Sequence, residues 1–238
     1  MLSEASQHAD TDLRKYIRSL PAGRISERDA KPLMLQLLWG VAFLHGRWLF
    51  HRDLKTSNIL VTQKGTRVKL CDFGLCRRWR VFCSSLAPLL SPPDTVVTLW
   101  YRAPELLLGA ANYTAAIDMW SLGCIMAEML LGQPIFRGQN EYQQVREIFT
   151  VLGLPTERSW PGFMKLPGAE LFGDLVRVNN RLADIFATKS RLSSNALDLL
   201  NRFLTYDPNR RIKAQSAMEH PWFRGVPKPA STQISGWD

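Results

Sequence analysis

Between residues 26 and 45, apolar side chains recur at the three- or four-residue spacing of one helix face. The members of this series are Leu33, Leu37, Val41 and Leu44. Ser26 stands at the start of the stretch and Asp29 follows three positions later, a spacing typical of a capped helix N-terminus. We therefore predict a long helix that begins beside Ser26, ends near His45 and buries its leucine-rich face.

A shorter helical pattern precedes this stretch over residues 12–20. Thr11 is suited to the N-cap position, and the run Pro21-Ala22-Gly23 is of the kind that ends a helix. Residues 1–10 are polar and show no period, so we predict an irregular segment there.

Further along the chain the pattern changes to short runs rich in apolar and β-branched residues. Three such runs, at residues 48–50, 59–61 and 68–70, predict short strands. Lys64-Gly65 lies between the last two runs and predicts a hairpin turn. Residues 75–95 contain several prolines and no period, which indicates a long loop.

Helical spacing returns in the remainder of the chain. The predicted helices cover residues 113–131, 141–152, 195–204 and 214–220. The fold class is therefore α+β, with a mainly α-helical domain that carries a small β insertion. We place this domain at residues 11–224, between the irregular segment 1–10 and a C-terminal tail at 225–238.

Charge and composition narrow the classes of partner. The 238 residues carry a formal net charge of +9, and the pI is about 9.7. The basic residues are scattered and form no long run, so the charge does not favour nucleic acid as a partner. Hydrophobic residues make up 46% and charged residues 21% of the chain, a balance that allows a globular core to be buried.

The cysteines indicate a reducing, intracellular compartment, nuclear or cytoplasmic. They are Cys71, Cys76, Cys83 and Cys124, and their spacing fits neither a zinc site nor a disulfide framework. Residues 1–10 lack the apolar centre of a signal peptide. The most apolar helical run contains Asp118 and Glu128 and is too short to span a bilayer, so we expect no membrane contact.

The β insertion contains two polar motifs that suit phosphoryl transfer. They are HRDLKTSN at residues 51–58 and DFG at residues 72–74. Asp53 can accept the proton of a substrate hydroxyl, and Lys55 can reach the transferred phosphate as a point charge. Asn58 and Asp72 offer hard oxygen ligands, which suit Mg²⁺ bound together with ATP. Each residue alone has an ordinary structural explanation, but their order and spacing together predict transfer of phosphate from ATP.

Four longer strings extend the pattern beyond these motifs. They are VVTLWYRAPELLLG at 96–109, IDMWSLGCI at 117–125, WPGF at 160–163 and YDPNRRI at 206–212. With them, the chain from about residue 11 to about 224 resembles a cyclin-dependent protein kinase of the CMGC group, most of all the PITSLRE-type and plant G-type branch. The resemblance implies a protein-kinase-like fold, Ser/Thr kinase activity with ATP and Mg²⁺, and a cyclin partner.

The resemblance also implies roles around the acceptor and the nucleotide. Thr98 would hydrogen-bond to Asp53 and Lys55 and hold the base in place. Leu60 would form the floor under the adenine ring. Residues 96–102 would shape the pocket beside the acceptor, so that protein substrates carry Pro after the phosphorylated Ser or Thr.

Structural roles follow from the same resemblance. Asp118 would accept backbone N–H groups of the catalytic loop. Glu105 would form an ion pair with Arg211. His51 and Phe73 would stack on each other as part of the hydrophobic spine.

Two family features are missing from the sequence. It contains no Gly-x-Gly-x-x-Gly and no Val-Ala-x-Lys, which in the family belong to an N-terminal β lobe that also carries the cyclin-docking helix. We therefore expect that the chain resembles the C-terminal lobe only, that the N-terminal β lobe and the docking helix are absent, and that it transfers little or no phosphate alone. The alternative is a non-catalytic kinase C-lobe that acts as a docking or regulatory module.

The activation segment also departs from the family pattern, because it is longer than usual. Pro93 occupies the position of the activating phospho-Thr, and Ser91 and Thr95 are neighbours out of register. In the family Arg52 helps to bind that phosphate, so its partner here is left open. We expect the basic run at residues 77–80 to be a solvated loop.

Overall fold

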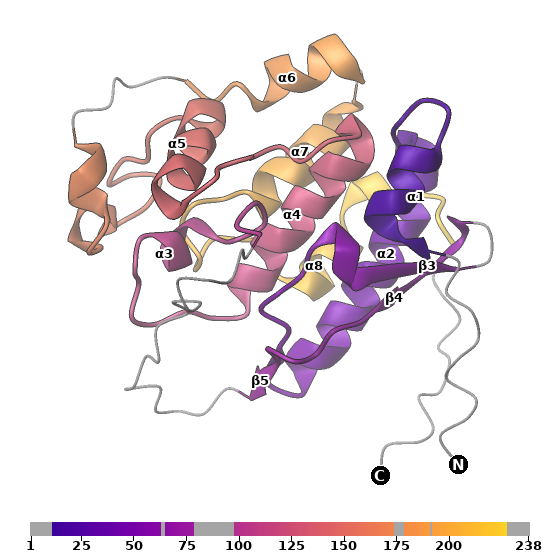
Figure 1. Cartoon of the computed structure of the whole chain (residues 1–238), viewed down its shortest axis with the longest axis horizontal. Coiled ribbons are helices and arrows are strands. Elements are labelled where there is room, and N and C mark those ends of the chain that lie inside the picture. The colour runs from indigo at the N-terminus through magenta and orange to yellow at the C-terminus, as the bar shows by residue number, and fades with distance from the viewer. Residues whose placement is uncertain (1–10, 63–64, 79–97, 174–178, 191, 228–238) are drawn as a thin grey trace.

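The structure is a computed structural model. It describes residues 11–62, 65–78, 98–173, 179–190 and 192–227. Residues 1–10, Lys64 of the predicted hairpin turn and most of the predicted tail 225–238 lie outside these ranges. Helices make up most of the described part, and two small antiparallel sheets complete it (Figure 1).

Helix α1 (Leu13–Ser19) is the shorter of the two helices predicted near the N-terminus. Its predicted cap is wrong by one residue, because the Asp12 carboxylate, and not Thr11, accepts the backbone N–H of Lys15 at 2.9 Å. A negative charge at this position also interacts favourably with the positive end of the helix dipole, which Thr11 could not do.

Helix α2 (Glu27–Gly46) confirms the prediction for the longer pattern. The Ser26 hydroxyl accepts the backbone N–H of Asp29 at 3.2 Å and donates to its carboxylate at 2.6 Å. The apolar series faces inward: Leu33, Leu37, Val41 and Leu44 are all buried. The helix is therefore fixed both by its cap and by its buried face.

The strands form two sheets. Strands β1 (Thr11–Asp12), β3 (Ile59–Thr62) and β4 (Arg67–Leu70) pair in the order β1-β3-β4, and β2 (Leu49–Phe50) pairs with β5 (Arg77–Arg78). All neighbours are antiparallel. The three predicted strands are thus confirmed as β2, β3 and β4.

Strands β1 and β5 were not predicted. Strand β5 corrects the expectation that residues 75–95 form one loop throughout, because Arg77 pairs with Phe50 across the second sheet. Arg77, the start of the basic run, is exposed as expected but lies in a strand rather than a loop, and residues 79–80 lie outside the described residues. A two-residue strand carries no readable period, and its pairing depends on a partner far away in sequence.

Further helices follow the sheets. They are α3 (Pro104–Leu107), α4 (Ala116–Leu131), α5 (Glu141–Leu152), α6 (Leu182–Lys189), α7 (Ser194–Phe203) and α8 (Ala214–Met218), with 3₁₀ turns η1 (Thr56–Asn58), η3 (Phe163–Lys165), η4 (Ala169–Phe172) and η5 (Pro221–Phe223).

The predicted bounds of α5 are confirmed, and α7 lies one residue earlier than predicted. Helix α4 begins at Ala116 rather than Tyr113, and α8 ends at Met218 because His220 caps the separate turn η5. Helices α3 and α6, of four and eight residues, are too short to show a clear period and were not predicted.

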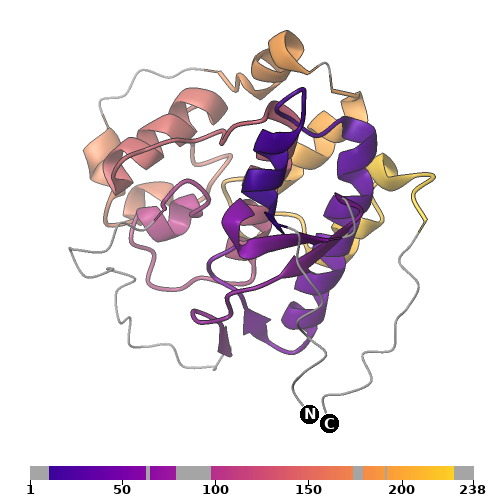
Figure 2. The same ribbon diagram turned by 45° about the vertical axis from the view of Figure 1, so that its right-hand side comes forward.

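Helix α4 lies at the centre of the fold. Its residues from Ala116 to Leu130 are all buried, as expected for a helix that is apolar on every side. It packs against α2 and α7, and the views of Figures 1 and 2 agree on this arrangement. Gly132 ends the helix in the left-handed region at φ 78°, where a side chain would be strained.

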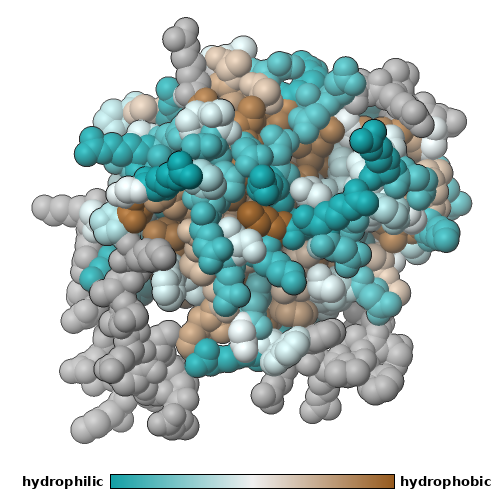
Figure 3. Space-filling model, turned by 180° about the vertical axis from the view of Figure 1, so that it is seen from behind, coloured by the Kyte–Doolittle hydropathy of each residue, from teal (hydrophilic) through white to brown (hydrophobic). Residues whose placement is uncertain are grey.

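The surface is mixed in character. On the reverse face, hydrophilic residues dominate and hydrophobic residues reach the surface in separate spots (Figure 3). In the described ranges, every helix is too short or too polar to cross a membrane.

Candidate active site

The first polar motif forms the loop between β2 and β3. His51 and Leu54 are buried, with 0% and 1% of their surface exposed, and anchor this loop in the core. Asp53 and Lys55 alternate with them and remain partly exposed. The buried residues therefore fix the loop, and the side chains of Asp53 and Lys55 reach the solvent.

Two neighbouring side chains hold the Asp53 carboxylate. Lys55 Nζ lies 2.7 Å from Asp53 Oδ2. Asn58 Nδ2 donates to the same oxygen at 3.0 Å and to the Asp53 backbone carbonyl at 2.9 Å. Asp53, Lys55 and Asn58, predicted as site residues, are thus brought together, and among the described residues both side-chain donors contact Asp53 Oδ2 rather than Oδ1.

Asp118 fastens the loop to helix α4. Its carboxylate accepts the backbone N–H groups of His51 at 3.0 Å and Arg52 at 2.9 Å, and it contacts His45 Nε2 at 2.8 Å. The predicted role of Asp118 is confirmed, whereas His45 was not predicted. Arg52 has a φ of 70°, a strained value for a residue with a side chain, and these hydrogen bonds help to stabilise it.

The second motif lies beside the first. The Cys71 backbone N–H donates to the Asn58 carbonyl at 3.0 Å, and His51 Nε2 lies 3.1 Å from the Cys71 carbonyl. The rings of His51 and Phe73 are 5.2 Å apart, which confirms that they are neighbours, but they are tilted by 49° rather than stacked, and Phe73 is 48% exposed. Asp72 is exposed, with a φ of 63°, so it projects from a strained backbone close to Asn58.

Asn58 and Asp72 fit a magnesium ion that is bound with a nucleotide. Because Asn58 Nδ2 is used by Asp53, its Oδ1 remains as a neutral oxygen ligand. Asp72 adds an exposed carboxylate. Among the described residues, no group of three or more His, Cys, Asp or Glu side chains could hold a metal. A site with only two protein ligands is usual for Mg²⁺, because this ion keeps several waters and binds largely through substrate phosphates.

The remaining predicted site residues are less constrained by the structure. Leu60 lies on β3 and is partly buried. In the part of the chain that the structure describes, Thr98 makes no hydrogen bond to Asp53 or Lys55, so its role stays a prediction. Residues 79–97, which include the predicted activation positions, lie outside the described residues.

Arg102 lies close enough to Asp53 for the two charges to interact. Burial lowers the pKa of Arg102, while the carboxylates of Glu141 and Asp53 act to raise it. Arg102 Nη1 lies 3.3 Å from Glu141 Oε1. The segment that begins at Thr98 therefore passes close to Asp53.

The predicted ion pair between Glu105 and Arg211 is confirmed. The guanidinium donates to both carboxylate oxygens, at 2.7 and 2.9 Å, and both side chains are buried. Arg211 also donates to the carbonyls of Thr205, Ala116 and Tyr206. These groups lie in the core, so the pair stabilises the fold and does not contact a substrate.

A second buried cluster was not predicted from the sequence. Thr56 of η1, Tyr101 and Glu128 of α4 meet through their side chains. Burial raises the pKa of Glu128, and burial and the Glu128 charge raise the pKa of Tyr101. The signal available in the sequence was Glu128 itself, a charged residue inside an apolar helix.

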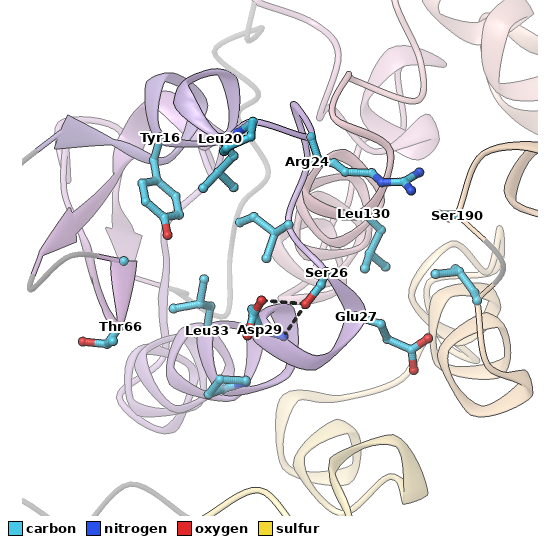
Figure 4. Close-up of a pocket in the computed structure, with 16 residues that line it drawn as sticks. Tyr16, Leu20, Arg24, Ser26, Glu27, Asp29, Leu33, Thr66, Leu130 and Ser190 are labelled. Carbon is cyan, nitrogen blue, oxygen red and sulfur yellow. Dashed lines mark hydrogen bonds between the residues drawn. The ribbon is translucent and has the colours of Figure 1, made fainter.

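A pocket of about 860 Å³ lies between α1, α2 and the turn that leads into β4 (Figure 4). Its lining includes Tyr16 and Leu20 of α1, Leu33 of α2, Leu130 of α4 and Thr66 of the turn. Its lining contains no residue of the two polar motifs. The pocket is therefore separate from the candidate active site.

Comparison with known proteins agrees with this arrangement. The protein kinase domain family matches residues 1–223. The chain is 52% identical over 212 residues to cyclin-dependent kinase G-1 of Oryza sativa subsp. indica, covering 87% of this chain and 29% of that protein. It is 46% identical over 201 residues to human cyclin-dependent kinase 11B, covering 84% and 24%. It is 44% identical over 225 residues to cyclin-dependent kinase B2-1 of Oryza sativa subsp. japonica, covering 93% and 65%.

The share of each relative's length that the chain covers limits what can be concluded from these matches. The chain spans 29% of the length of the G-type relative, so the activity of that whole protein is not carried over by the match. The family match begins at residue 1 and does not test whether an N-terminal β lobe is absent, which stays a prediction. The family match over residues 1–223 shows that the chain belongs to the protein kinase domain family, and the relatives to which it is similar are cyclin-dependent kinases.

Proposed function

We propose that the chain acts as a Ser/Thr protein kinase in which Asp53 accepts the proton of the acceptor hydroxyl. The observation that carries the proposal is the clamp on Asp53, whose Oδ2 is bonded by both Lys55 and Asn58. A general base must be held in one geometry, and two donors on one oxygen leave the other oxygen to the substrate.

The neighbouring side chains would then divide the work. Lys55 stabilises negative charge on the transferring phosphoryl oxygens, and Asn58 and Asp72 would hold the metal ion. ATP would supply the phosphoryl group, and Mg²⁺ would neutralise the charge on its oxygens. Leu60 would lie under the adenine, and Thr98 would restrain Asp53 once substrate is bound.

The substrate and the partner are part of the same proposal. We infer protein substrates with Pro after the acceptor, and a cyclin as regulator, from the family and from the names of the relatives. A nuclear or cytoplasmic location is consistent with the free thiols of Cys71, Cys76 and Cys124.

Transfer of radiolabelled phosphate to a Ser-Pro peptide tests the proposal. As predicted from the sequence, we expect the chain alone to incorporate little label, and this label should fall to background in Asp53→Asn, which cannot accept the proton. Glu147→Gln, an exposed acid on α5, is the matched control and should keep the wild-type rate. Label that persists in Asp53→Asn would contradict the assignment of the base.

A docking or regulatory module is the second candidate, and the pocket between α1 and α2 favours it (Figure 4). The two candidates differ in nucleotide binding, because a ligand that binds the folded state must raise its melting temperature. A rise with millimolar ATP and Mg²⁺ that is lost in Asp72→Asn supports the kinase. The absence of both a rise and any transferred label supports the docking module.

A further inference from the structure

Three buried polar side chains meet at one point beneath the catalytic loop. Thr56 Oγ1 lies 2.8 Å from the Tyr101 hydroxyl and donates to Glu128 Oε1 at 3.2 Å. The Tyr101 hydroxyl donates to Glu128 Oε2. Thr56 is 0%, Glu128 3% and Tyr101 5% exposed, so water does not compete for these hydrogen bonds.

These residues come from three parts of the chain. Thr56 begins η1, Tyr101 precedes α3, and Glu128 lies near the end of α4. Since α4 is buried along its length, the Glu128 carboxylate is a fixed point to which the two other segments are attached. A second bond, from the Ser121 hydroxyl to the Tyr101 carbonyl at 2.8 Å, attaches the Tyr101 backbone to the same helix.

Thr56 lies between the two residues that hold Asp53. Lys55 precedes it and Asn58 follows two positions later, and the Asn58 backbone N–H donates to the Lys55 carbonyl at 2.9 Å across η1. A shift of Thr56 therefore moves both donors to the Asp53 carboxylate. Tyr101 in turn lies next to Arg102, whose charge interacts with Asp53.

We propose that the Thr56 hydroxyl is a positioning group that couples the acceptor-side segment, residues 98–103, to the catalytic loop through Tyr101 and Glu128. This proposal rests on the kinase function proposed above. It assigns Thr56 no contact with substrate: Thr56 acts on Asp53 through η1, and on the acceptor-side segment through Tyr101.

Three single variants of the whole chain test the coupling by kinetics. Thr56→Val keeps the shape but removes the hydroxyl, Thr56→Ser keeps the hydroxyl, and Ser57→Ala changes the exposed neighbour in the same turn. Thr56→Val should lower kcat/KM for a Ser-Pro peptide about tenfold, the size expected for a lost hydrogen bond to a buried carboxylate. KM for ATP should change less than about twofold, and Thr56→Ser should recover most of the loss.

Hydrogen exchange supplies a readout that needs no phosphoryl transfer. In Thr56→Val the amides of residues 53–58 and of residues 98–103 should both exchange faster, while Ser57→Ala should leave both segments unchanged. If Thr56→Val does not fold, Tyr101→Phe replaces it, and faster exchange is then expected at residues 53–58, away from the substituted position.

The two readouts separate this proposal from the kinase function. Faster exchange in both segments supports the coupling whether or not the chain transfers label, whereas label that persists in Asp53→Asn contradicts only the kinase function. Faster exchange in only one segment, or in neither, overturns the coupling. So does a kinetic loss that Thr56→Ser fails to recover or that falls equally on ATP and peptide.

Discussion

At the residue scale, three buried carboxylates fix the polar groups of the site and of the core around it. Asp118 is 1%, Glu105 2% and Glu128 3% exposed, and each accepts at least two hydrogen bonds. A buried charge is tolerated only when such donors replace water. Each of these acids therefore fixes the groups that donate to it, and the loss of one should have a local and measurable effect.

Asp118→Asn should loosen the catalytic loop. The amide has one acceptor oxygen, and its NH₂ group would face a backbone N–H, so one of the bonds to His51 and Arg52 is lost. We expect exchange of these two amides to become about tenfold faster or more, because a bond to a charged acceptor contributes about 1.5–3 kcal/mol. Hydrogen exchange measures this, with Asp184→Asn on the surface of α6 as control. Unchanged exchange at both His51 and Arg52 would contradict the role given to Asp118.

The Glu105–Arg211 pair leads to a prediction for stability. Glu105→Gln leaves the buried Arg211 charge without a carboxylate, which should lower the free energy of unfolding by about 3–5 kcal/mol. Glu141→Gln breaks the pair with Arg102, in which the Glu141 side chain is 48% exposed, and should cost less than about 1 kcal/mol. Urea denaturation measures both, and equal losses in the two variants would show that burial does not decide the effect.

At the element scale, one side chain joins the start of α2 to the C-terminal part of the fold. Glu27, in the first turn of α2, accepts the backbone N–H and the hydroxyl of Ser193 at 2.9 and 2.6 Å. It also accepts the indole N–H of Trp222 at 2.9 Å. Ser193 caps α7 and Trp222 lies in η5, so three elements depend on one carboxylate.

This junction should make stability depend on pH. Partial burial raises the pKa of Glu27, but the hydrogen bonds from Ser193 and Trp222 outweigh it and hold the pKa below its usual 4.5. An acid with a lowered pKa in the folded state contributes stability above its unfolded pKa, and this contribution is lost as the pH falls through the folded pKa. Glu27→Gln should therefore be less stable than wild type at pH 7, by no more than about 1 kcal/mol because the bonds to Ser193 are exposed to water.

The pH profile gives the control for this prediction. As the pH falls below 4.5 and through the lowered pKa of Glu27, the difference between Glu27→Gln and wild type should shrink, because the wild-type carboxyl becomes protonated as well. Thermal unfolding from pH 7 downward measures the difference. A gap that stays constant across this range would mean that Glu27 acts by shape alone and not through its charge.

For the whole molecule, local patterns were sufficient to predict some elements and not others. Helix α2 was predicted because its period and the cap at Ser26 agree, and a cap of this kind is made by residues three positions apart. Strand β5 and the contact between Thr56 and Tyr101 depend on groups far apart in sequence, which no local pattern specifies. Among the site residues, Asp53, Lys55 and Asn58 were identified because they belong to one short motif. Tyr101 was not identified, because its role depends on a hydrogen bond to Glu128 of α4, which is distant in sequence.

The contact between α4 and α7 allows a test of how much the packing around α4 contributes to stability. Gly123 of α4 faces α7 so closely that an added Cβ would lie 2.7 Å from Phe203 Cβ and 3.0 Å from Leu204 Cδ2. Neither neighbour can give way easily, because Phe203 and Leu204 are buried, 0% and 4% exposed. Gly123→Ala should therefore lower the free energy of unfolding by about 1–3 kcal/mol, although alanine favours a helix by up to about 1 kcal/mol.

Gly46→Ala separates these two opposing effects. Gly46 is the last residue of α2, and an added Cβ there meets no atom within 4 Å, so only the helix preference of alanine remains. We expect Gly46→Ala to be neutral or to raise stability by up to about 1 kcal/mol. Urea denaturation of both variants gives the comparison. If Gly123→Ala were as stable as Gly46→Ala, α4 and α7 would have to move apart at no cost, and a tightly packed core around α4 would be contradicted.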